Sequence, residues 1–129
     1  MTQLLIDLEV SPETDVERLA DATRQLRREL LELDVEAADF VAAGPAPQRA
    51  KAGTPIDWGK LLVTFAASGG VLTTLINVLQ SWINRRQASS IALEIDGDRL
   101  EITGTPTEEQ RRLIDLWLSR HQGFIISDD

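Results

Sequence analysis

The 129-residue sequence contains no cysteine and only one histidine, and both shortages restrict the chemistry available to it. Without cysteine the chain has no disulfide, no thiolate nucleophile and no cysteine-ligated zinc or iron–sulfur site. The one histidine, His121, falls near the end of the last expected helix, where a cation favours the helix dipole, so we interpret it as structural rather than catalytic. Hydrolytic triads and transition-metal sites therefore lack their usual residues, and we predict no enzymatic activity and no cofactor.

Positive charge is also scarce, because 13 lysines and arginines stand against 21 acidic residues and give a formal net charge of −8. Such a chain repels phosphate backbones, so nucleic acid is not an expected partner. The arginines at positions 24, 27 and 28 lie among acids and are typical of a solvated helix face. The first residues carry acids inside an apolar run and no basic leader, which together with the lack of cysteine predicts a cytoplasmic location.

The residues that are present predict one globular domain over 1–129, since 43% are hydrophobic and 26% charged. Leu4, Ile6, Leu8 and Val10 alternate with polar residues and predict a strand with one buried face. A helix is expected next, with a capping box formed by Thr14 and Glu17 and an apolar stripe that runs to residue 33. Residues 35–42 form a weaker strand candidate.

A Pro/Gly-rich stretch at about 43–53 predicts a flexible linker between two halves of the domain. The sequence Thr54-Pro55-Ile56-Asp57 that follows has the cap, proline and acid typical of a helix start.

The segment between Lys60 and Arg85 contains no charged residue and is close to the length that spans a bilayer. We expect a long helix or a helical hairpin here, kinked or closely approached at Gly69 and Gly70. Three interpretations stay open at this point. The segment can pack against the sheet, form an interface with a partner or a second copy, or, as a less favoured alternative, let residues 61–84 associate with or insert into a membrane.

A β-hairpin is predicted after this segment, because Asp96-Gly97 is a favoured two-residue turn between two apolar-alternating runs. The register pairs Leu93 with Leu100 and Glu94 with Arg99. A last helix should open at Thr105-Pro106-Thr107-Glu108, and the end of the chain is left open as a strand or a tail. The resulting fold class is α+β: a small, mostly antiparallel sheet (β-α-β, long helix, β-hairpin, helix) covered by helices.

The order and spacing of several segments resemble the effector-associated constant component family of bacterial conflict systems. The segments that carry the resemblance are Pro45–Lys51, Ala66–Gly70, Trp82–Arg86, Leu93–Asp98 and Glu108–His121. The resemblance implies a small invariant partner encoded beside variable effectors such as peptidases, which it regulates or recruits. It supplies no catalytic residues.

The function predicted from these observations is that of a non-enzymatic adaptor or regulatory component in bacterial immunity, one that self-associates and binds an effector protein. Binding energy in interfaces concentrates in a few aromatic and aliphatic anchors, which the charge-free helix and its tryptophan-bearing end offer. The predicted protein-binding residues are Trp58, Phe65, Gly69, Gly70, Leu72, Ile76, Leu79 and Trp82.

Overall fold

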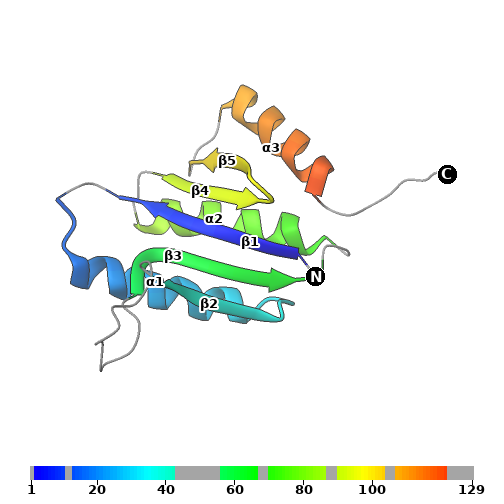
Figure 1. Ribbon diagram of the computed structural model, residues 1–129. Coiled ribbons are helices and arrows are strands. Elements are labelled where there is room, and N and C mark those ends of the chain that lie inside the picture. The colour runs from blue at the N-terminus through cyan, green and yellow to red at the C-terminus, as the bar shows by residue number, and fades with distance from the viewer. Residues whose placement is uncertain are drawn as a thin grey trace.

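The computed structural model describes residues 2–10, 13–42, 56–66, 70–86, 90–103 and 107–121. The elements are β1 (Thr2–Glu9), α1 (Val16–Leu31), β2 (Ala37–Ala42), β3 (Ile56–Phe65), α2 (Val71–Arg86), β4 (Ser90–Ile95), β5 (Asp98–Ile102) and α3 (Glu108–His121). The five strands form one antiparallel sheet in the order β2-β3-β1-β4-β5, which confirms the α+β class (Figure 1). The linker predicted at 43–53 and the end of the chain lie outside the described residues.

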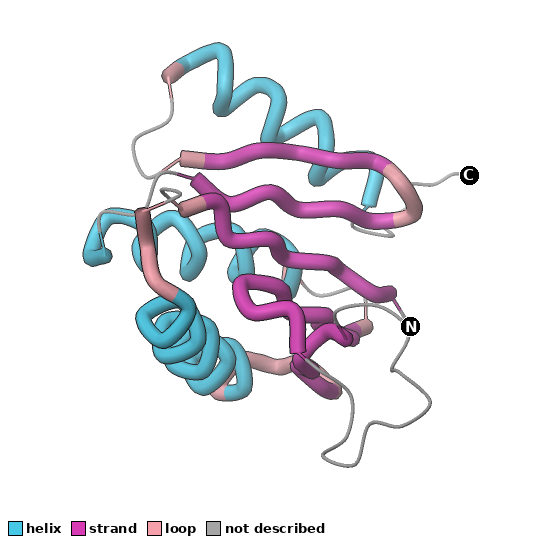
Figure 2. The backbone as a smooth tube through the Cα atoms, turned by 60° about the vertical axis from the view of Figure 1, so that its left-hand side comes forward, coloured by secondary structure: helices cyan, strands magenta, loops and turns pink. Residues whose placement is uncertain are grey.

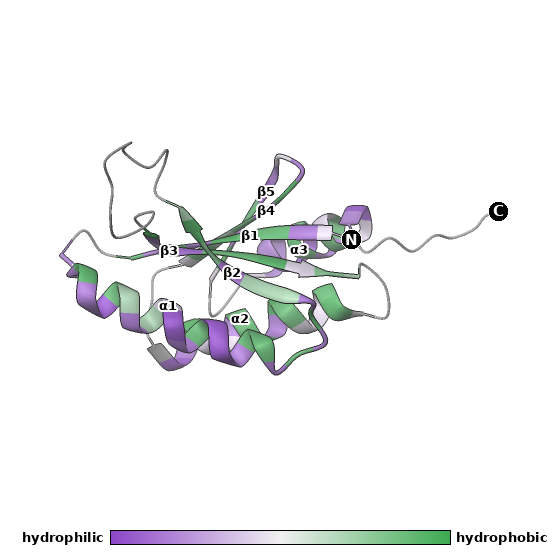
Figure 3. Cartoon of the chain, turned by 60° about the horizontal axis from the view of Figure 1, so that its bottom comes forward, coloured by the Kyte–Doolittle hydropathy of each residue, from purple (hydrophilic) through white to green (hydrophobic). Residues whose placement is uncertain are grey.

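The helices gather on one side of the sheet, and the other face of the strands is left uncovered by any described helix (Figures 1 and 2). Helix α1 packs against β2 and β3, α2 packs against β4 and α1, and α3 packs against β5. Figure 3 shows hydrophilic and hydrophobic residues interspersed along α1, while α2 carries a larger share of hydrophobic residues. The most apolar helix therefore occupies the middle of the helical layer.

The first strand and helix form as the sequence predicts. Side chains of β1 alternate between buried and half-buried, and Thr23, Leu26 and Leu30 of α1 are fully buried. The helix cap differs by one residue from the prediction, because Asp15 rather than Thr14 accepts the hydrogen bond, from the Arg18 N–H at 2.8 Å. Aspartate is as good an N-cap as threonine, so the helix simply begins one residue later than expected.

The helix start predicted at Thr54-Pro55-Ile56-Asp57 is wrong, since a ten-residue strand, β3, begins at Ile56. Leu61, Val63 and Phe65 face the core, and Leu62 and Thr64 between them are half-buried. β3 lies between β2 and β1, and its apolar residues from Leu61 to Phe65 form the part of this interior strand that packs into the core. A short apolar run of this kind cannot be distinguished from a buried helix by periodicity alone.

The charge-free segment is consequently divided rather than continuous, and the expected long helix is replaced by β3 followed by α2. Gly70 has a φ of +78° and directly precedes the first residue of α2, so it does not kink that helix. Among the described residues, no helix has the length and apolar character needed to cross a membrane.

Strand β3 bulges toward α1 at Gly59, which has a φ of +97°. Ala42 pairs with Ile56 but Phe40 pairs with Leu61, so β3 carries extra residues opposite β2. The Gly59 N–H donates to the hydroxyl of the buried Thr23 (3.0 Å), which itself donates to the Leu19 carbonyl (2.7 Å). The bulge therefore ties β3 to the inner face of α1.

The predicted β4–β5 hairpin is confirmed in every pair. Leu93 lies opposite Leu100, and Glu94 lies opposite Arg99. Asp96 and Gly97 both have positive φ values, 51° and 83°, as a two-residue hairpin turn of the favoured type requires.

Candidate protein-binding groove

The structure places most of the predicted protein-binding residues in the hydrophobic core. The exposed fraction is at most 2% for Phe65, Leu72, Ile76, Leu79 and Trp82. These side chains hold α2 against the sheet, so in this conformation they cannot supply an exposed binding surface on a single chain. Gly70 is exposed at the start of α2, and Gly69 lies outside the described residues.

Trp58 is partly exposed and belongs to a different surface. Its ring packs edge-on against Phe40, with 5.3 Å between centroids, and the Arg24 guanidinium lies 4.7 Å from its centroid. Arg27 covers the Phe40 ring in the same way at 5.2 Å. The structure thus separates Trp58, on the β2–β3 side of the sheet, from the α2 residues with which it was grouped by sequence.

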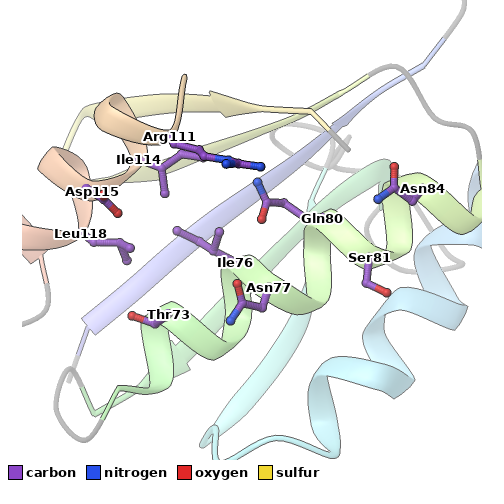
Figure 4. A pocket seen from close by; sticks show the side chains of 10 residues that line it. All are labelled: Thr73, Ile76, Asn77, Gln80, Ser81, Asn84, Arg111, Ile114, Asp115 and Leu118. Carbon is purple, nitrogen blue, oxygen red and sulfur yellow. The ribbon is translucent and has the colours of Figure 1, made fainter. Parts of the chain in front are cut away.

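A groove with a volume of about 540 Å³ lies between α2 and α3 (Figure 4). Helix α2 contributes Thr73, Ile76, Asn77, Gln80, Ser81 and Asn84, and helix α3 contributes Arg111, Ile114, Asp115 and Leu118. The floor is apolar, because the Ile76 and Ile114 side chains are almost fully buried. The upper walls are polar and include the exposed side chains of Asn77 and Ser81.

The polar wall on α2 follows from helical spacing. Residues 73, 77, 80 and 84 recur at steps of four, three and four, which brings them to one side of the helix. The opposite side of the same helix carries the buried leucines that contact the sheet. The sequence shows this stripe as polar residues within the charge-free segment, but only the position of α3 reveals that it lines a groove.

The other wall depends on how α3 is held. The Trp117 indole is fully buried and donates to the Asp98 carbonyl at 3.0 Å, which fixes the helix to the first residue of β5. Arg120 Nε donates to the Asp98 carboxylate at 2.8 Å, and His121 Nε2 lies 2.6 Å from the same oxygen. Hydrogen bonds from Arg120 and His121 lower the pKa of Asp98, so the carboxylate stays ionised and the contact is retained at neutral pH. His121 therefore serves a structural contact, which agrees with its interpretation from sequence.

The N-terminal end of α3 is fixed by a capping box. The Gln110 N–H donates to the Thr107 hydroxyl (3.2 Å), and the Thr107 N–H donates to Gln110 Oε1 (3.3 Å). The Thr103 hydroxyl, just beyond β5, also donates to Gln110 Oε1 (3.1 Å). Both ends of α3 are thus tied to β5, and the α3 wall of the groove is preformed.

The side chains that line the groove carry no net charge, although the chain as a whole has a net charge of −8. The charged side chains that line it are Arg111 and Asp115, one of each sign, and the remaining polar groups are amides and hydroxyls. Such a lining recognises neutral hydrogen-bonding groups better than ions. No group of three or more His, Cys, Asp or Glu side chains that could hold a metal occurs within the described part of the chain.

Taken together, the fold and the groove define a small α+β protein in which one layer of helices covers an antiparallel five-stranded sheet and offers a preformed interhelical groove. The chain belongs to the Effector Associated Constant Component 1 family, whose model matches residues 13–118. This confirms the family expected from the sequence, and the family name describes a constant component that associates with effectors. No curated protein and no solved structure matches the chain.

Proposed function

We propose that this protein is a non-enzymatic adaptor that binds an effector protein in the groove between α2 and α3 and that also self-associates. The observation that carries the proposal is the groove itself: an apolar floor between two fixed helices, with uncharged hydrogen-bonding side chains above it. Membership of an effector-associated family supports an effector as the partner. A peptidase is the class of effector that the sequence resemblance implies.

The shape of the groove favours a helix of the effector as the bound element. An amphipathic helix can place its apolar face against the half-buried Leu118, above the buried floor of the groove, and its polar flanks on the amides of Asn77 and Gln80. The amides both donate and accept, so they can satisfy backbone carbonyls or side chains of either kind. Arg111 and Asp115 then fix the orientation of a flank that carries the opposite charges.

Calorimetry with the effector encoded beside this chain tests the proposal, using Asn77→Arg as the blocking variant and Thr74→Arg as its control. Both residues are exposed on α2 and both changes add one positive charge, but only Asn77 lines the groove. We expect Asn77→Arg to weaken effector binding by about tenfold or more and Thr74→Arg to leave it within about twofold. Equal affinities for the two variants would show that the effector binds elsewhere.

A further inference from the structure

β5 is the last strand of the sheet, and no described strand pairs with its outer edge. In an antiparallel hairpin with a two-residue turn, Ile95 and Asp98 exchange hydrogen bonds, and the direction then alternates along the strand. The N–H and C=O groups of Arg99 and Glu101 therefore point away from β4. At the other edge, Arg27 Nε donates to the Ala38 carbonyl of β2, and the bulge interrupts the β2–β3 ladder. Both features disfavour the addition of another strand beside β2.

The charges on this edge are self-complementary. Arg99 and Glu101 flank Leu100, and both are exposed on the helix-free face of the sheet, whereas Leu100 faces the helices. If a second β5 lies antiparallel to the first with Leu100 opposite Leu100, each Arg99 faces the Glu101 of the other copy. Residues 99 and 101 are also the ones whose backbone groups point outward, so the same register forms the interchain hydrogen bonds.

Exposed leucines lie beside the same edge. Leu113 and Leu116 of α3 are 52% and 56% exposed, high values for leucines in the described part of the chain. With Leu100 and the flanking residues of β5 they line a groove of about 350 Å³ between α3 and the strand edge. A strand added at this edge passes beneath these side chains and removes them from water.

Around Glu101 the carboxylates outnumber the cations, and in this register Arg99 of a second copy places a cation beside it. A hydrogen bond and repulsion from Glu9 raise the pKa of Glu101, so the two carboxyl groups compete on the open face. Arg99, which faces Asp7, Glu9 and Glu94 within its own chain, approaches them only at 3.6–3.7 Å. Its guanidinium is thus loosely held and has donors left for a carboxylate of a second copy.

We propose that two copies of this chain pair through antiparallel β5 strands centred on Leu100, so that the two sheets join into one across a two-fold axis. Each Arg99 binds Glu101 of the second copy, and Leu113 and Leu116 of α3 cover the joined strands. This inference rests on the self-association included in the proposed function, but it uses a surface separate from the effector groove.

Sedimentation velocity on the full chain, with charge-reversal variants, tests this arrangement. Wild-type protein is expected to form a dimer. Arg99→Glu and Glu101→Arg should each weaken it by about tenfold or more, because each places two like-charged pairs across the axis. An equimolar mixture of the two variants restores opposite charges at both pairs, so it should form a mixed dimer within about threefold of wild-type affinity. Arg28→Glu, on α1, changes the net charge as Arg99→Glu does and should leave the dimer intact.

The outcomes separate this inference from the rest of the proposal. A wild-type chain that is monomeric up to about 1 mM would overturn both the strand pairing and self-association. Dimers that persist in both variants, or a mixture of folded variants that stays monomeric, would overturn only the β5 pairing. Effector binding by Asn77→Arg is measured independently, so its result decides the groove and not the dimer.

Discussion

The two buried tryptophans of the helical layer differ in whether the indole N–H has a hydrogen-bond partner, and this difference predicts different effects of mutation on stability. Trp82 and Trp117 have exposed fractions of 1% and 0%. The Trp117 indole N–H donates to the Asp98 carbonyl, whereas the Trp82 indole N–H has no hydrogen-bond partner among the described residues. Replacement of each by phenylalanine removes a similar volume from the core. At Trp117 it also removes a paired N–H group, and at Trp82 an unpaired one.

The expected magnitudes follow from these contacts. Loss of part of a buried tryptophan side chain costs about 1–2 kcal/mol in packing at either site, a fraction of the cost of truncation to alanine. Trp117→Phe also loses a hydrogen bond worth about 1 kcal/mol, so it should destabilise the fold by about 2–3 kcal/mol. Trp82→Phe removes an unpaired buried donor that costs about 1–3 kcal/mol, so its net effect should be close to zero.

Urea unfolding followed by far-UV circular dichroism measures both free energies of unfolding without relying on tryptophan fluorescence. The slopes against urea should be unchanged, so that a shift of midpoint reports stability alone. We expect Trp117→Phe to be less stable than Trp82→Phe by about 2 kcal/mol or more. Equal losses in the two variants would refute the assignment of different polar environments to the two indoles.

Two further predictions concern Gly59 and Asp98. Gly59→Ala should destabilise the fold by about 1 kcal/mol more than Gly70→Ala in urea unfolding. Both glycines have positive φ, but of the two only Gly59 would bring the new methyl group against another side chain, Leu19, at 3.3 Å. Equal losses of stability in the two variants would contradict this. Because the folded state lowers the pKa of Asp98 from 3.8, its contribution is complete above that value and disappears as the pH falls through the lower folded pKa. The difference in urea midpoint between wild type and Asp98→Asn should therefore be present at about pH 7 and shrink toward about pH 2, and a difference independent of pH would count against the Asp98 contact.

Local patterns predicted the parts of the fold that local chemistry determines. The β4–β5 register follows from Asp96-Gly97 and the alternation on both sides, because a two-residue turn leaves only one pairing. The inner face of α1 follows equally well from its apolar stripe, since burial of that stripe is the main source of helix stability. In both cases residues close in sequence decide the structure.

The position of β3 could not be predicted in this way, because its character depends on neighbours distant in sequence. Leu61 to Phe65 become a strand by lying between β2 and β1, and no signal within the segment itself reveals those partners. The same limit applies to the candidate site. Apolar residues such as Leu72 and Trp82 suggested a binding surface, yet α2 buries them and turns Asn77 and Gln80 toward α3 instead. The groove arises only when two elements meet.

The most direct test of the central claim is backbone amide chemical-shift mapping of the isotope-labelled chain as the unlabelled effector is added. Binding in the groove predicts the largest changes at residues 73–84 of α2 and 111–118 of α3, with small changes at the uncovered face of β1. Changes concentrated on the strands, or around Trp58 on β3, with α2 and α3 unaffected, would contradict the account.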